Sequence, residues 1–137
     1  MTDPAGRVLT FNYGNSATPN QASSIQDSVG VIANYNYDGN SNLTQVTYAD
    51  GSLLAMAYDS SNQLTGVTDT NGKTIETHTY DSSHRGLTSQ RANGVDAVSV
   101  FYYGSYTYLY DSENHFSYYQ HTYVSGEVTC SPKSAQS

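Results

Sequence analysis

Tryptophan is absent from this chain, and lysine and arginine together supply only five of its 137 residues. Twelve Asp and Glu residues leave a formal net charge of −7 at pH 7. Such an acidic chain repels phosphate backbones, and it lacks the basic patch that nucleic-acid binding requires. We therefore expect no nucleic-acid partner.

Cysteine occurs once, as Cys130, which excludes an internal disulfide and a zinc site built from several cysteines. No stretch approaches the roughly 18 consecutive apolar residues of a membrane-spanning helix. The first residues, MTDPAGRVLTF, contain no apolar core of a secretory signal. Either the chain stays inside the cell or it belongs to a longer exported parent. We expect the second, with an extracellular or cell-surface location.

The composition favours strands. Charged residues make up only 12% of the chain, whereas disordered proteins combine low hydrophobicity with high net charge. Tyrosine occurs 14 times, and Tyr and Thr are strand-forming residues. We expect one all-β domain over residues 1–137.

Three Tyr-Asp dipeptides between residues 37 and 81 follow one another at spacings of 21 and 22 residues. An Asp-Gly or Asn-Gly pair follows each dipeptide, which predicts a two-residue type I′ hairpin turn between alternating strands. The Asp of each dipeptide begins a polar loop, whose backbone N–H groups its carboxylate can cap. The repeat positions are Tyr37, Asp38, Tyr58, Asp59, Tyr80 and Asp81, with the turn glycines Gly51, Gly72 and Gly94.

This pattern resembles the YD-repeat, or Rhs-repeat, family. The degenerate start at residues 2–10 and the stretch from Tyr103 to Phe116 extend the resemblance to about five units. In that family, long repeat arrays coil into a β-sheet shell. The resemblance implies a shell around a toxin or other cargo, as in bacterial Rhs and toxin-complex proteins, or a teneurin-like barrel. Five units are few for a shell, so we expect a piece of a larger protein or a minimal derivative.

The expected fold is all-β, with tandem antiparallel hairpins from Arg7 to about Val128 in one curved sheet or an incomplete barrel or spiral. Residues 14–29 are polar and are expected to be a loop-like insertion. Residues 102–124 are expected to form Tyr-rich last hairpins, and residues 129–137 a tail. An open sheet edge invites pairing with another strand, so we expect a homo-oligomer.

The Tyr-rich region is the first candidate site. Period two places Tyr106, Tyr108 and Tyr110 on one face of a strand, and a neighbouring strand with Tyr119 and Tyr123 would extend an aromatic wall. One interpretation is cross-strand packing, worth roughly 0.2–1 kcal/mol per pair. The other is a surface for carbohydrate or for a partner. The candidate binding residues are Tyr102, Tyr106, Tyr108, Tyr110, Tyr119 and Tyr123.

The second candidate is a metal site, because His115 and His121 lie close in sequence to Asp111 and Glu113, and these residue types ligate zinc. On this alternative the chain is a small metal-dependent hydrolase of esters or phosphoesters. The sequence has no H-x-x-x-H spacing and no nucleophile elbow. The preferred interpretation is a non-catalytic structural or interaction module that needs no cofactor.

Overall fold

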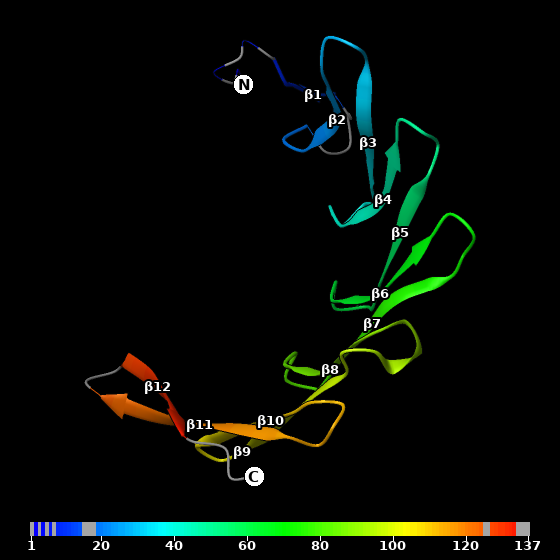
Figure 1. Cartoon of the computed structure of the whole chain (residues 1–137). Helices are drawn as coiled ribbons and strands as arrows, with labels where there is room; N and C mark the ends of the chain where they lie inside the picture. The colour runs from blue at the N-terminus through cyan, green and yellow to red at the C-terminus, as the bar shows by residue number, and fades with distance from the viewer. Residues whose placement is uncertain are drawn as a thin grey trace. The chain divides into compact units, whose positions relative to one another are not determined.

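The computed structural model describes residues 2, 4, 6, 8–14, 19–124 and 127–133. It is an all-β fold, and the predicted tandem antiparallel hairpins are confirmed. Every strand pairing that is described is antiparallel and joins strands that follow one another in the chain (Figure 1). The strands are β1 (Thr10–Tyr13), β2 (Ala22–Gln26), β3 (Val31–Tyr37), β4 (Leu43–Tyr48), β5 (Leu53–Tyr58), β6 (Leu64–Asp69), β7 (Thr74–Tyr80), β8 (Gly86–Arg91), β9 (Val98–Tyr103), β10 (Tyr106–Tyr110), β11 (Phe116–Val124) and β12 (Glu127–Lys133).

The chain divides into two compact units, Met1–Ile75 and Glu76–Ser137. Each unit is described by itself below. In the described residues, no helix has the length and apolar character needed to cross a membrane.

Two stretches differ from the expected secondary structure. Part of the stretch 14–29, expected to be a loop, forms strand β2, which pairs with both β1 and β3. The sequence signal was weak because β2 (ASSIQ) holds a single large apolar residue, Ile25. Its cross-strand partners are Phe11 and Ala33. Part of the expected tail at 129–137 belongs to strand β12.

In the first unit, one face of the sheet is apolar. Directly opposite residues of antiparallel strands share a face, and the cross-strand pairs Val46–Leu54 and Met56–Val67 lie on the same face. Val46 and Val67 are each only 8% exposed. The opposite face carries mostly small and polar residues, including the pairs Asn34–Thr47, Gln45–Ala55 and Ala55–Thr68, with Leu53 opposite Thr47.

The glycine turns differ from the predicted type I′ geometry. At Asp50-Gly51 and Asn71-Gly72 only the glycine has positive φ, at 83° and 74°. The N–H of Gly72 donates to the Asp69 carbonyl, and the N–H of Asp69 donates to the Lys73 carbonyl. This is a type I turn closed by one left-handed residue, a three-residue loop that also suits a twisted hairpin.

Only Asn93-Gly94 has positive φ at both positions, at 62° and 76°. The dipeptide alone does not distinguish a two-residue loop from a three-residue loop. For that reason the type I′ prediction was wrong at two of the three turns.

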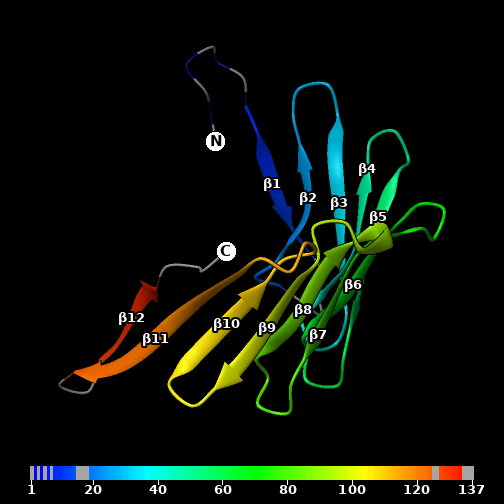
Figure 2. The same cartoon turned by 60° about the horizontal axis from the view of Figure 1, so that its bottom comes forward.

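In the second unit, strands β7 to β12 pair in chain order. Figure 2 shows β9, β10 and β11 side by side. This part of the unit carries the aromatic residues of the first candidate site.

Candidate functional site

Each Asp of the Tyr-Asp repeat caps a turn. Its Oδ1 atom accepts hydrogen bonds from the backbone N–H groups two and four residues later, at 2.8–2.9 Å. The residue three positions after the Asp is left-handed in every case, with φ from 61° to 70°. The four capping residues are Asp38, Asp59, Asp81 and Asp111.

The sequence predicted this capping role at the first three positions. Asp111 was placed in the metal-site hypothesis instead, although it too follows a tyrosine. The shared geometry shows that Tyr110-Asp111 begins a turn of the same kind.

The second carboxylate oxygen holds the side chain of the residue four positions later. Asn42 Nδ2 donates to Asp38 Oδ2 at 2.9 Å, and Arg85 Nε donates to Asp81 Oδ2 at 2.8 Å. His115 Nδ1 lies 3.0 Å from Asp111 Oδ2. Both oxygens of these carboxylates therefore serve the local turn.

These hydrogen bonds favour the ionised carboxylates. The Asn42 amide, together with turn N–H groups, holds the pKa of Asp38 below its usual 3.8. The backbone N–H of Arg85, followed by its guanidinium, lowers the pKa of Asp81. For Asp111, burial acts to raise the pKa, but hydrogen bonds from His115 and turn N–H groups outweigh it, and the pKa is lowered.

Acid is therefore expected to destabilise the protein. A carboxyl whose pKa is lowered by folding stabilises the folded state above its unfolded pKa, near 3.8, and that contribution disappears as pH falls through the lower folded value. The urea midpoint should be constant from pH 7 to about 5 and should fall below about pH 4. Asp38→Asn keeps an acceptor oxygen but cannot ionise, so its midpoint should fall less steeply. If the urea midpoints of the unaltered chain and of Asp38→Asn fell equally steeply with pH, the stabilising role of the ionised Asp38 would be contradicted.

Tyrosine hydroxyls tie neighbouring strands together. Tyr37 donates to the Ala22 carbonyl at 3.1 Å, and Tyr58 donates to the Leu43 carbonyl at 2.9 Å. Burial raises the pKa of both phenols, which is expected for hydroxyls in neutral hydrogen bonds within the sheet. The Tyr and the Asp of a repeat therefore act together: one fixes the strand pair and the other fixes the turn that follows.

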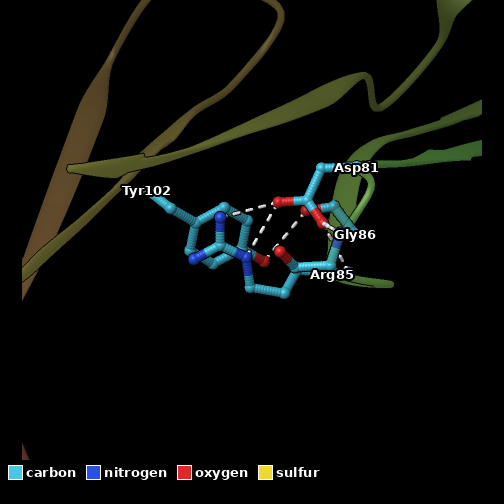
Figure 3. A network of polar contacts seen from close by, with 5 residues as sticks. Asp81, Arg85, Gly86 and Tyr102 are labelled. Carbon is cyan, nitrogen blue, oxygen red and sulfur yellow. Dashed lines mark hydrogen bonds and ion pairs between the residues drawn. The ribbon is translucent and has the colours of Figure 1, made fainter. Parts of the chain in front are cut away.

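Tyr102 has a similar role, although it lies outside a Tyr-Asp dipeptide. Its hydroxyl donates to the Gly86 carbonyl at 2.9 Å, and the Arg85 guanidinium carbon lies 4.0 Å from the centre of its ring. Figure 3 shows Arg85 between this ring and Asp81, whose Oδ2 atom is 2.7 Å from an Arg85 terminal nitrogen. Both of these contacts of Tyr102 are made within the second unit.

The residues of the metal-site hypothesis lie at opposite ends of one hairpin. Asp111, Glu113 and His115 belong to the turn between β10 and β11. His121 lies near the far end of the hairpin, where its Nε2 atom is 2.8 Å from Thr107 Oγ1. Across the described ranges, no three His, Cys, Asp or Glu side chains are grouped to hold a metal ion.

The Tyr-rich strands form an aromatic cluster on one face of the sheet. Tyr106, Tyr108 and Tyr110 lie on the same face of β10, as the sequence predicted. Ring centroids are 5.7 Å apart for Tyr108–Tyr118 and 5.6 Å apart for Tyr110–Phe116, and both pairs are stacked. The cluster consists of Phe101, Tyr106, Tyr108, Tyr110, Phe116 and Tyr118.

Register decides which tyrosines join this cluster. Tyr118 is opposite Tyr108, whereas Tyr119 is opposite Thr107 and faces the other side of the sheet. The predicted pairing with Tyr119 was wrong because a shift of one residue exchanges the two faces. Tyr102 is also opposite Thr107 and is likewise outside the cluster. The side chain of Tyr123 lies outside the described part of the chain.

An open pocket of about 600 Å³ adjoins the aromatic cluster. Two of its aromatic residues are well exposed, Phe101 at 55% and Tyr103 at 77%. Asp111 and Asn114 supply polar groups at one end. The lining residues are Ser99, Phe101, Tyr103, Tyr108, Tyr110, Asp111 and Asn114.

Residues 58–95 match the family model described as RHS Repeat. This segment carries the RHS repeat. The match contains two of the Tyr-Asp turns described above, those of Asp59 and Asp81. These two capped turns therefore lie within the matched RHS-repeat segment.

Two solved structures are similar to this chain over most of its length. The crystal structure of TcdB2-TccC3-TEV matches 96% of this chain with a TM-score of 0.58 and 14% identity. The crystal structure of TcdB2-TccC3-Cdc42 matches the same share with a TM-score of 0.58 and 12% identity. The chain spans 8% of the length of each of those chains. At these identities the likeness concerns the fold. No curated protein matches the sequence.

Proposed function

We propose that this chain is a non-catalytic structural module, a segment of RHS-repeat wall that belongs with a larger parent or partner protein outside the cell. One observation carries the proposal: the repeating Tyr and Asp side chains are occupied in holding strands and turns together. Repeated Tyr and Asp residues with these contacts support a structural role in the sheet. The fold of the much longer TcdB2-TccC3 chains supports the same role.

The module is expected to associate through its edge strands. Among the described residues, β1 pairs with β2 alone and β12 with β11 alone. An unpaired edge presents backbone N–H and C=O groups to any further strand. We propose that a parent chain, or another copy of this chain, supplies that strand.

Light scattering over a range of concentrations tests this proposal. The mass should exceed the 14.9 kDa of one chain and rise with concentration. Tyr13 lies on β1 and is 60% exposed, so Tyr13→Lys should reduce association, because charge on an edge strand opposes pairing. Val29→Lys adds the same charge at a 93% exposed position outside the strands and should not. A constant monomer mass for the unaltered chain would overturn self-association.

The aromatic cluster is proposed as the interaction surface of the module. Tyr108, Tyr118, Phe116 and Tyr110 form a run of rings, in which successive stacked pairs are tilted by only 24–28°. Near-parallel, partly exposed rings suit the apolar face of a carbohydrate or a flat surface on a partner protein.

A further inference from the structure

The pocket beside the aromatic cluster differs from the stacked rings in geometry. Phe101 and Tyr110 meet at 89° with their centroids 5.5 Å apart, so two pocket walls stand at a right angle. Of the stacked run, Tyr108 and Tyr110 line the pocket, whereas Phe116 and Tyr118 do not. A corner of perpendicular rings is a poor platform for a flat sugar. It can, however, place several ring faces and edges around one compact group.

The charge around the pocket is negative. Asp111 lines it, and no lysine or arginine occurs anywhere in residues 92–132. Glu113 follows in the same turn, with its carboxylate 3.6 Å from His115 Nδ1. Hydrogen bonds hold Asp111 in its ionised form, as described above. An anionic ligand would therefore be repelled, and a cation would be attracted.

Aromatic faces attract cations through the ring quadrupole, and quaternary ammonium groups are bound in this way by rings arranged around them. The second unit already contains such a contact, because the Arg85 guanidinium lies 4.0 Å from the Tyr102 ring centre. That cation comes from the chain itself, whereas no lysine or arginine lines the pocket, whose Asp111 carboxylate has the His115 ring as its side-chain partner, 3.0 Å away.

We infer that the pocket lined by Phe101, Tyr103, Tyr108, Tyr110 and Asp111 binds a small organic cation, namely an alkylated ammonium group. The rings contact the alkyl groups of the ligand, and the Asp111 carboxylate lies beside its positively charged nitrogen. This inference goes beyond the structural role and does not depend on self-association.

The test is an NMR titration of the full chain with choline and with 3,3-dimethyl-1-butanol, which has the same shape but no charge. Choline should give saturable shifts at the amides of Ser99, Asp111 and Asn114. The neutral compound should bind about two- to fivefold more weakly, since an exposed cation–π contact contributes that much. Comparable affinity for both compounds, or no saturable shift up to about 0.1 M choline, would overturn the inference.

Three variants locate the site. Phe101→Leu keeps an apolar side chain at an exposed position but removes the ring, and should weaken choline binding about two- to fivefold. Asp111→Asn keeps an oxygen that can cap the turn but removes the charge, and should also weaken binding. Tyr119→Leu changes a ring on the opposite face and should leave the affinity unchanged. If Phe101→Leu binds choline as tightly as the unaltered chain, the pocket assignment is wrong. A light-scattering mass recorded on the same samples reports self-association separately.

Discussion

Val46→Asp is expected to lower the free energy of unfolding by about 3 kcal/mol or more. Val46 is 8% exposed and lies on the apolar face of the first unit, opposite Tyr35 on one side and Leu54 on the other. A carboxylate there loses water without gaining a charged partner. Urea unfolding followed by far-UV circular dichroism measures the loss.

The neighbouring residue provides the control. Thr47 is in the same strand but belongs to the polar face, opposite Asn34 and Leu53. Thr47→Asp introduces the same charge and should cost much less. Similar losses for Val46→Asp and Thr47→Asp would show that the two faces do not differ as their cross-strand partners indicate.

Tyr58→Ala is expected to cost about 3 kcal/mol, near the lower end of the range for removing a packed aromatic side chain. The substitution removes a half-buried ring and the hydrogen bond from its hydroxyl to the Leu43 carbonyl. Tyr58→Phe removes only the hydroxyl and should cost about 1 kcal/mol. Both are measured from urea midpoints at neutral pH.

Tyr48→Ala is the matched comparison, because Tyr48 also ends a strand but is 41% exposed. Its loss should be less than half that of Tyr58→Ala. If Tyr58→Phe were as stable as the unaltered protein, the cross-strand hydroxyl bond would have no net stabilising effect.

Residues that repeat were the ones whose roles could be predicted. Tyr-Asp at a regular spacing predicted both the hairpins and the capping role of Asp38, Asp59 and Asp81, because three copies show which feature is shared. β2 was missed because ASSIQ contains one apolar residue and no repeat signal. Asp111 was misassigned because two nearby histidines suggested metal ligation more directly than a fourth turn.

The aromatic cluster shows a different limit of sequence reasoning. Alternation alone placed Tyr106, Tyr108 and Tyr110 on one face. Which residues of β11 join them depends on hairpin register, and Tyr118 and Tyr119 are adjacent in sequence. The pocket depends in addition on the perpendicular arrangement of Phe101 and Tyr110. Neither register nor ring orientation is encoded in the spacing of tyrosines.

Pairing between consecutive strands also affects how such a protein forms. Each described strand finds its partner after a short loop, so little chain entropy is lost in closing any one pair. Folding can then follow the order of synthesis, with each new hairpin added to an edge that already exists. A wall built in this way grows from one end, and the last strand completed remains open to the next.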